Sequence, residues 1–280
     1  MDVRVWFNIC MIFYHTSAAE SVRGKVLFAN FTSINEIDVK TRIVTVLVNH
    51  GDSVYSLDYD YQNKYVYFPR YNLNYIMRFP YPSQNITLQH VVSTSLSPSG
   101  VAVDSANDHV YWVNNYGNTV SRCKLDGTNV VVVSNSLSNT FMIRLDVINR
   151  WLYIGYYNKG ISKSRFDLTD MSMIANFTSN TYCMDIDLIE QRLYWMNYNG
   201  DIKSVNVDGS DVKTIISTNY RKCYYAIGVS GSYIYYADNN NQLVMMNKSQ
   251  GSTPTVLYND TSTMASIYVF KSTGMYITLT

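Results

Sequence analysis

Short runs of β-forming residues alternate with polar turns along this chain, and one stretch shows the pattern most clearly. Between residues 100 and 134, β-branched and aromatic residues gather in four runs, at 100–103, 109–113, 119–125 and 130–134. Asp126-Gly127 joins the last two runs, which is a strong hairpin signal because glycine tolerates a positive φ. Four such strands in succession predict one small antiparallel sheet, and a sheet of this size cannot bury its faces alone.

The same pattern recurs along the chain. Each copy carries a pair of aromatic or apolar residues, and in chain order these pairs are Leu27-Phe28, Tyr67-Phe68, Tyr111-Trp112, Tyr153-Ile154, Tyr194-Trp195 and Tyr235-Tyr236. The second residues of successive pairs are 40, 44, 42, 41 and 41 positions apart. A period near 40 residues with four strands per unit is typical of propeller blades. The sequence therefore predicts an all-β fold, a six-bladed β-propeller of four-stranded antiparallel blades.

The repeats resemble the YWTD, or class B, repeats of the low-density lipoprotein receptor family. The match rests on residues 111–114 and 194–197 and on the strand at 98–104, and it covers roughly residues 24–280. The resemblance implies a six-bladed propeller that binds ligands without catalysis. In that family the fourth motif position is usually an Asp that ties neighbouring blades together. Here it is occupied by Asn30, Arg70, Asn114, Tyr156, Asn197 and Asp238. We therefore expect contacts between blades that are more apolar, or weaker around the second and fourth copies.

The two ends of the chain are predicted to meet in one sheet. The first copy lacks an innermost strand, whereas residues 266–270 repeat the innermost-strand pattern with no blade of their own. Pairing them with residues 25–30 closes the ring and removes two exposed sheet edges. Residues 20–280 then form one propeller domain. The segment from Met275 to Thr280 is surplus, and it either pairs loosely or leads into a longer natural chain.

The N-terminus and the composition point to export. Residues 1–19 combine Arg4, an apolar run at 5–14 and small residues at 17–19, which predicts a secretory signal peptide rather than a truncated core strand. That run is too short to span a membrane, and no other stretch approaches the roughly 20 apolar residues required. With 15% charged residues and a formal net charge of +1, the chain lacks the excess of basic residues that is typical of nucleic-acid-binding proteins. We expect a secreted or extracellular protein, or a fragment of a membrane-anchored receptor.

Glycosylation acceptors and cysteines fit that compartment. Five Asn-X-Ser/Thr sequons begin at Asn30, Asn85, Asn176, Asn247 and Asn259. Cys183 and Cys223 occupy nearly equivalent places in consecutive blades, in the segments that enter the innermost strands. We hypothesise a disulfide between them. The alternative is two separate thiols that are too far apart to bridge.

The sequence carries no local catalytic motif, but four carboxylates share one register. Asp60, Asp104, Asp146 and Asp187 each lie eight residues before the second residue of a motif pair. Side chains in equivalent registers form an arc at one level of the propeller, which suggests a cation site or an acidic mouth. The favoured interpretation is that each Asp accepts hydrogen bonds from backbone donors in its own turn.

Two classes of function remain. The first is a monomeric, extracellular, non-enzymatic propeller that needs no cofactor and binds a protein ligand or a neighbouring receptor module. Tyrosines at one end of the ring are candidate anchors for such a partner, or else rim packing; they are Tyr156, Tyr157, Tyr220 and Tyr224. The second class is a calcium-dependent six-bladed hydrolase of the lactonase or esterase type. Only the four aspartates in one register support this class.

Overall fold

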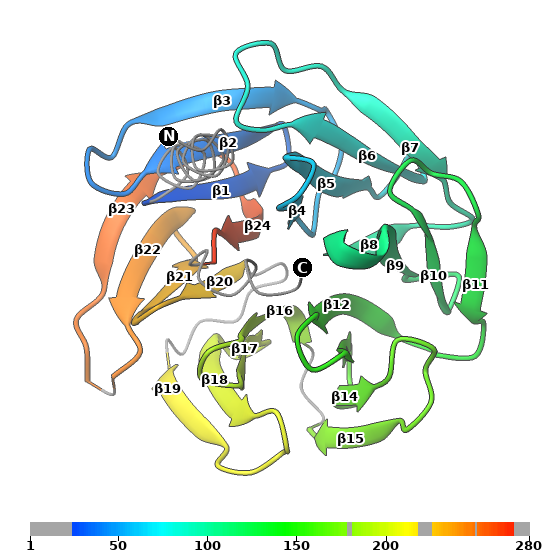
Figure 1. Cartoon of the computed structure of the whole chain (residues 1–280). Helices are drawn as coiled ribbons and strands as arrows, with labels where there is room; N and C mark the ends of the chain where they lie inside the picture. The colour runs from blue at the N-terminus through cyan, green and yellow to red at the C-terminus, as the bar shows by residue number, and fades with distance from the viewer. Residues whose placement is uncertain (1–23, 178–180, 218–225, 250, 272–280) are drawn as a thin grey trace, which may run out of the picture.

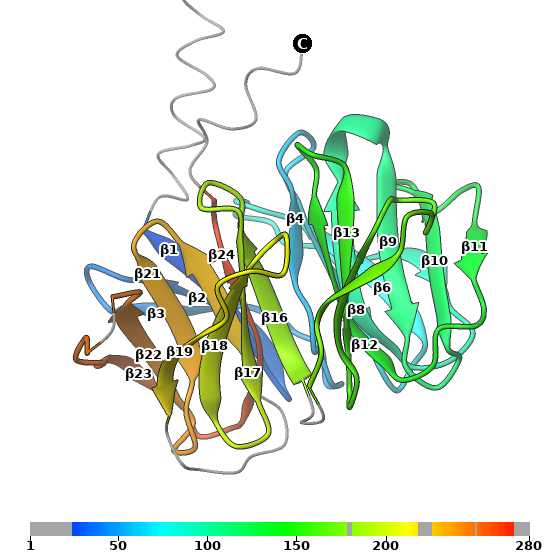
Figure 2. The same cartoon turned by 90° about the horizontal axis from the view of Figure 1, so that it is seen from below.

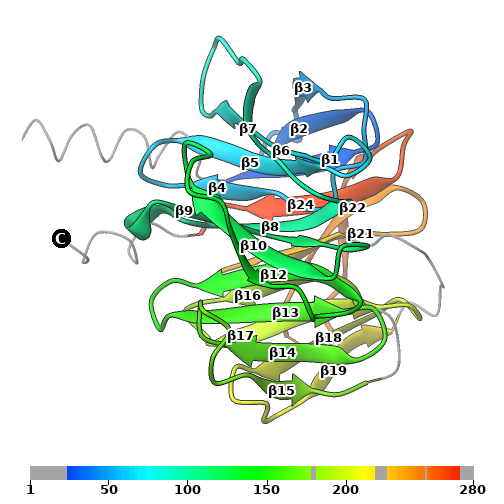
Figure 3. The ribbon, with the colours of Figure 1, turned by 90° about the vertical axis from the view of Figure 1, so that its right-hand side faces the viewer.

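The computed structural model describes residues 24–177, 181–217, 226–249 and 251–271, and these form six four-stranded antiparallel sheets around a central axis (Figure 1). Figures 2 and 3 show the ring from two further sides, with the strands running roughly along its axis. The predicted six-bladed propeller is confirmed. We name the blades A to F in chain order.

Each blade is a meander whose four strands follow one another from the axis outward. Blade A contains β24 (Met264–Val269), β1 (Lys25–Asn30), β2 (Ser33–Asp38) and β3 (Val44–Asn49). Blade B contains β4 (Asp58–Asp60), β5 (Tyr65–Arg70), β6 (Tyr75–Pro80) and β7 (Gln89–Ser93). Blade C contains β8 (Pro98–Asp104), β9 (His109–Asn114), β10 (Thr119–Lys124) and β11 (Val131–Ser134), and one 3₁₀ turn, η1 (Ser105–Asn107), follows β8.

The second half of the ring repeats this order. Blade D contains β12 (Thr140–Asp146), β13 (Trp151–Tyr156), β14 (Gly160–Ser164) and β15 (Ser172–Ala175). Blade E contains β16 (Thr181–Asp187), β17 (Arg192–Asn197), β18 (Asp201–Asn206) and β19 (Lys213–Ser217). Blade F contains β20 (Ile227–Ser230), β21 (Tyr233–Ala237), β22 (Gln242–Asn247) and β23 (Thr255–Asn259).

The ring closes where the sequence predicts. Strand β24 pairs antiparallel with β1, with Val26 opposite Val269 and Phe28 opposite Ile267. The chain ends thus share blade A, and β24 supplies its innermost strand (Figure 1). Residues 1–19 and 275–280 lie outside the described residues, so the signal peptide and the fate of the surplus segment remain predictions.

The motif pairs hold neighbouring blades together. Adjacent residues in a strand point to opposite faces of the sheet, so the two members of a pair face different neighbours. Each apolar cluster between two blades contains the first residue of one blade's pair and the second residue of the next blade's pair. The cluster between the last blade and the first completes the ring in the same way. These combinations are Leu27 with Phe68, Tyr67 with Trp112, Tyr111 with Ile154, Tyr153 with Trp195, and Tyr235 with Phe28.

That burial explains why a sheet that is unstable alone becomes stable in the ring. Every one of these ten side chains is at most 8% exposed. Burying an aromatic or large aliphatic side chain contributes about 1.5–3 kcal/mol relative to leaving it in water. The Tyr194 ring and the Tyr236 ring join the cluster of Tyr153 and extend the same packing through blades E and F.

The Asp126-Gly127 hairpin signal is also confirmed. Gly127 lies between β10 and β11 with φ +91°, a conformation that favours glycine. A Cβ atom built on Gly127 would lie 1.9 Å from the carbonyl oxygen of Val91, so blade C approaches β7 of blade B too closely for any side chain. Glycine is therefore required here both by the turn and by the packing between blades.

Candidate functional site

One end of the ring carries a set of aromatic side chains. In a meander, the turn between the second and third strands and the segment that enters the next blade emerge at the same end of the sheet. Four blades place an aromatic residue immediately after the fourth motif position, and blade C places one a residue later. We call this set the tyrosine face, and it consists of Phe31, Tyr71, Tyr116, Tyr157 and Tyr198. Tyr116 is 72% exposed and the other four are half-buried.

Aromatic contacts connect this face across several blades. The ring centroid of Tyr71 lies 6.4 Å from that of Tyr116 and 5.0 Å from that of Tyr55. Phe141 then bridges Tyr55, at 5.4 Å, and Tyr157, at 4.8 Å. Such spacings lie in the range where aromatic pairs attract one another beyond simple burial. The result is an aromatic surface that runs from blade C to blade D over the buried rings of Tyr55 and Phe141.

The polar groups of this end are mostly asparagine amides. Asn115 occupies the position that is aromatic in blades A, B, D and E, and its Nδ2 donates to the hydroxyl oxygen of Tyr71 at 2.9 Å. Burial raises the pKa of Tyr71, so the phenol stays neutral at physiological pH and its oxygen remains a hydrogen-bonding group. Further asparagines stand in the same turns, at Asn72, Asn74, Asn118, Asn158 and Asn199. Rigid tyrosines beside adaptable amides are the composition of protein-binding surfaces such as antibody loops.

The predicted partner anchors are only partly placed on this face. Tyr157 belongs to the tyrosine face, but the expectation that Tyr156 is an exposed anchor is wrong. Tyr156 is 1% exposed, and its hydroxyl pairs with that of Ser162 at 3.0 Å, because it is the last residue of β13 and faces the opposite way from its neighbour. Tyr220 and Tyr224 lie outside the described residues. The position after the motif was the signal that could have revealed Tyr71 and Tyr198.

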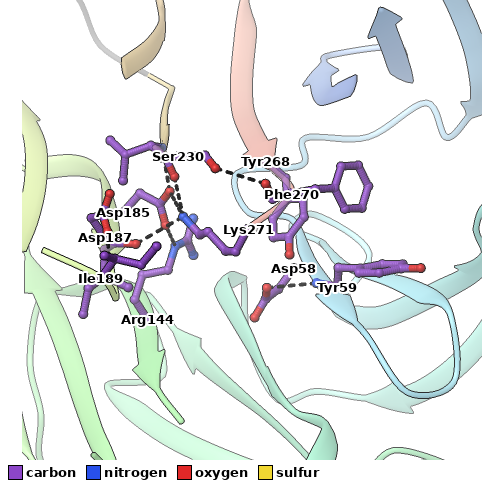
Figure 4. A network of polar contacts seen from close by, with 12 residues as sticks. Asp58, Tyr59, Arg144, Asp185, Asp187, Ile189, Ser230, Tyr268, Phe270 and Lys271 are labelled. Carbon is purple, nitrogen blue, oxygen red and sulfur yellow. Dashed lines mark hydrogen bonds and ion pairs between the residues drawn. The ribbon is translucent and has the colours of Figure 1, made fainter. Parts of the chain in front are cut away.

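The axis of the ring is filled by charged side chains that sequence reasoning missed (Figure 4). Lys271, directly beyond the closing strand, donates from Nζ to Asp185 Oδ2 at 2.6 Å and to the carbonyl oxygen of Val229 at 2.7 Å. Arg144 Nε lies 3.4 Å from the other carboxylate oxygen of Asp185. Asp58 Oδ2 accepts a hydrogen bond from the backbone N–H of Val103 at 2.7 Å. Blades D, E and F and the end of the closing strand thus meet in one polar network, and Asp58 links blade B to blade C at the same level.

A register signal for this network exists in the sequence. Asp58, Arg144 and Asp185 each lie two residues before a register aspartate, so they project from the innermost strands on the same side. Burial raises the pKa of Asp58 to about 6, and the nearby Arg144 charge opposes that rise. A small pocket of about 20 Å³, room for roughly one water molecule, lies next to Lys271.

Three of the four register aspartates accept backbone donors of their own turns, as the favoured interpretation holds, and Asp104 is the exception. The carboxylates of Asp60, Asp146 and Asp187 accept backbone N–H groups two and three residues later, at 2.9–3.1 Å. Asp104 accepts instead from the side-chain amide of Asn107 at 3.1 Å. In the described part of the chain, no three His, Cys, Asp or Glu side chains are grouped so that they could hold a metal ion.

Two of these aspartates also join blades. Asp104 forms an ion pair with Arg150 of blade D, with Nη1 and Oδ2 2.6 Å apart. Asp187 pairs with Lys248 of blade F. The Asp187–Lys248 pair is buried on both sides, with side chains 6% and 9% exposed, whereas Asp104 is buried but its partner Arg150 is 42% exposed. Polar contacts between blades therefore come in part from the innermost-strand turns, a role that the family resemblance assigns to the fourth motif position.

The fourth motif position keeps a cross-blade role in some copies. Asn30 Nδ2 donates to Asp260 at 2.9 Å, from blade A to the segment that leaves blade F. Arg70 donates to the carbonyl oxygen of His50, in the segment between blades A and B. Asn197 and Asp238 instead accept N–H groups of their own turns. The contact at the second copy is thus made by a guanidinium, whereas the hydroxyl of Tyr156 at the fourth copy pairs within its own blade and its ring packs in the cluster between blades C and D.

The export-related residues differ in accessibility. Asn85, Asn176 and Asn259 are exposed and Asn247 is half-buried. Asn30 is only 5% exposed, because its Oδ1 accepts from the backbone N–H groups of Thr32 and Ser33, at 2.9 and 2.8 Å. Glycosylation of Asn30 would require this side chain to leave the fold.

The proposed disulfide cannot be placed. Cys183 is buried and forms no disulfide with any residue in the described ranges, and Cys223 lies outside them. Burial raises the pKa of Cys183 to about 12, so its thiol is protonated and unreactive in this state. The bridge remains a hypothesis for peptide mapping.

No protein-family model matches this sequence, and no curated protein matches it. Among solved structures, a chain in the crystal structure of a nidogen/laminin complex is similar, with a TM-score of 0.77 and 18% sequence identity. The alignment covers 87% of this chain and 97% of that chain. At this level of identity the similarity is one of fold. No helix in the ranges that the structure describes is long and apolar enough to cross a membrane.

Proposed function

We propose that this chain is an extracellular, non-enzymatic propeller that binds a protein partner through the tyrosine face. The observation that carries the proposal is the row of rings Tyr116, Tyr71 and Tyr157, which the buried rings of Tyr55 and Phe141 connect from beneath. Tyrosine is enriched at binding hot spots because it buries a large area at a small entropic cost. The turns of a rigid scaffold are also where recognition residues usually lie.

The residue composition of the tyrosine face indicates which partner surface would fit it. Its turns are dominated by tyrosine and asparagine, so the partner surface should be largely uncharged, with apolar groups to cover the rings and polar groups to meet the amides. The structure that resembles this fold comes from a complex of two named proteins, nidogen and laminin, which is consistent with a propeller used in protein binding. We also propose that this chain is related to the propellers of the low-density lipoprotein receptor family. A neighbouring receptor module is then a second candidate partner.

The calcium-dependent hydrolase is the weaker alternative. A catalytic calcium needs several oxygen ligands at 2.3–2.6 Å that are free to turn toward it. The register aspartates are instead committed to turn donors and, at Asp104 and Asp187, to cations of the next blade. A calorimetric titration that finds one stoichiometric calcium ion, together with lactone hydrolysis that chelation abolishes, would favour the hydrolase.

The test is an affinity capture from conditioned medium and cell-surface extracts with the full chain and two matched variants. Tyr116→Ala removes the most exposed ring of the face, whereas Tyr233→Ala removes a 42% exposed ring at the start of β21, outside the face. We expect a partner that the wild type and Tyr233→Ala retain and that Tyr116→Ala loses. A hot-spot tyrosine contributes at least about 2 kcal/mol, so affinity should fall about 30-fold. If every captured protein binds all three forms equally, the tyrosine face is not the binding site.

A further inference from the structure

The chain carries one more motif pair than the ring has blades. Tyr276-Ile277 follows Tyr235-Tyr236 by 41 residues, the spacing that also separates the fourth, fifth and sixth pairs. Residues 272–280, which we call the C-terminal tail, lie outside the described residues, so this seventh pair is identified from the sequence. In the six sheets of the described residues, every second strand is already formed by one of the earlier pairs.

The seventh pair fits the repeat better than the first pair does. The first member of the pair is a tyrosine in every copy except the first, where it is Leu27. Isoleucine is also the second member in blade D, at Ile154, and an apolar residue precedes the pair in all seven copies, here Met275. Residues 275–277 therefore have the pattern of a blade's second strand.

The place that this pair would take in a blade is occupied by β1. In each blade the pair lies in the second strand, beside the innermost strand. The innermost strand that precedes the tail is β24, and its paired edge holds β1, with Phe28 opposite Ile267 and Leu27 opposite Tyr268. Leu27 and Phe28 are fully buried and pack in the clusters toward blades B and F, respectively. Two segments of the chain therefore match one position.

We propose that residues 274–278 are a substitute for β1, so that blade A has two alternative second strands and the ring has two ways to close. Placing Ile277 opposite Ile267 reproduces the register of β1 and leaves a connection of three residues, 271–273. Hairpins use connections of this length, and serine suits a turn. Because side chains alternate along a strand, the two members of the pair then face blades B and F as those of β1 do. This inference does not depend on the tyrosine face.

Chain connectivity decides which segment occupies the position. Strand β1 continues into β2 through residues 31–32, and Asn30 Nδ2 donates to Asp260 at 2.9 Å, so β1 is favoured in the closed ring. The tail follows β24 directly, and its pairing closes a loop of a few residues. Strands β1 and β24 lie at opposite ends of the described chain, so their pairing closes a much longer loop at a greater entropic cost. The tail therefore takes the position when β1 is weakened or removed.

The first test is disulfide trapping in the full chain, with Val269→Cys in every variant. Val26→Cys reports the pairing of β1, because Val26 lies opposite Val269. Met275→Cys reports the proposed pairing, in which Met275 takes the same place, and directly opposed residues are close enough for a disulfide. Thr280→Cys is the matched control, because it lies in the same tail but out of register. All variants keep the native cysteines.

Weakening β1 should move the bridge from one partner to the other. Phe28→Asp places an unpaired carboxylate at a fully buried position of β1. Without this change, the bridge between positions 26 and 269 should predominate. With it, the yield of the bridge between positions 275 and 269, relative to the Thr280→Cys control, should rise at least about tenfold. Equal yields for Met275→Cys and Thr280→Cys, or no rise with Phe28→Asp, would overturn the proposal.

Folding supplies a second, independent measurement, read by tryptophan fluorescence in urea without the added cysteines. Ile277→Asp alone should leave the unfolding midpoint unchanged, because β1 is intact. Phe28→Asp should remain folded with an intact tail and should lose its folding transition when Ile277→Asp is added. Thr280→Asp places the same charge in the same tail and should not have this effect. If Phe28→Asp fails to fold with an intact tail, or if the two tail variants act alike in its background, the tail does not substitute for β1.

Discussion

Replacing Lys271 by methionine removes the only lysine of the axial network in the described residues while keeping a side chain of similar length (Figure 4). In the wild type, Nζ donates to Asp185 Oδ2 at 2.6 Å, to the Val229 carbonyl at 2.7 Å and to the Ile186 carbonyl at 3.1 Å. The Lys271 and Asp185 side chains are 16% and 10% exposed, so solvent screens the pair little. The variant therefore leaves a buried carboxylate and two carbonyl groups without this donor.

The expected loss follows from these contacts. Removing one member of a buried ion pair costs about 3–5 kcal/mol, because the remaining charge is left uncompensated. Asp185 retains Arg144 at 3.4 Å and the backbone N–H of Val229 at 2.8 Å, so the cost should lie at the lower end. We expect Lys271→Met to lower the free energy of unfolding by about 3 kcal/mol.

The assay is urea unfolding monitored by tryptophan fluorescence, with Lys213→Met as the control. Lys213 lies 2.6 Å from Asp211, but their side chains are 57% and 45% exposed, and such a surface pair contributes less than about 1 kcal/mol. Adding Asp185→Asn gives a double-mutant cycle in which coupling with Lys271→Met should exceed about 1 kcal/mol. If Lys271→Met loses no more stability than Lys213→Met, or the cycle shows no coupling, the axial network does not hold the ring together.

Three further predictions use other parts of the ring. The pKa of Asp58 is about 6 in the folded state against 3.8 for the free side chain, so the folded state binds this proton more tightly. The protonated carboxyl therefore favours folding at low pH, and this contribution is lost as the pH rises through 6. Asp58→Asn should increase the free energy of unfolding in urea by about 1–2 kcal/mol at pH 7 and leave it unchanged near pH 4. Gly127→Ala should cost about 3 kcal/mol in the same assay, and Gly231→Ala, also at positive φ but in open space, only about 1. In a secreting cell line, Asn85→Gln should remove one glycan mass by intact mass spectrometry, whereas Asn30→Gln should leave the mass of attached glycan unchanged.

The sequence predicts those features that repeat with the blade. The period of the motif pairs yields the number of blades, and the orphan strand near residue 267 yields the closure with Phe28. The role of Asp146 in its turn follows from turn chemistry alone. The axial network was not predicted because Lys271 and Asp185 are 86 residues apart in the sequence. In addition, no lysine recurs at the position of Lys271 in the other copies of the repeat. Only a ring that has already closed brings such residues together.

A second kind of error concerns single positions. The sequence makes Tyr156 a candidate anchor beside Tyr157, but it is the last residue of β13 and its side chain turns inward. Tyr157, one residue later, lies on the opposite side and belongs to the tyrosine face. Because side chains alternate along a strand, two consecutive residues at its end face opposite environments. Boundaries of this kind are set by pairing with the next strand, here Tyr156 opposite Gly160, and not by composition.

The exposure of Tyr116 is the strongest reason to propose that the tyrosine face binds a partner. Contacts between blades are made by the motif pairs, each reaching both neighbours, and by polar groups at the fourth position and in the innermost-strand turns. After the motif, Phe31, Tyr71, Tyr157 and Tyr198 are half-buried and also pack against the core, so their rings serve packing as well. Tyr116 is the ring of this set that stands mostly in solvent, at a turn position where turn chemistry favours Asn, Asp or Gly. Tyr116 is 72% exposed beside Gly117, so its ring is not required by the core. We therefore place the centre of the proposed interface at this exposed ring, which adjoins Tyr71 and its bound Asn115.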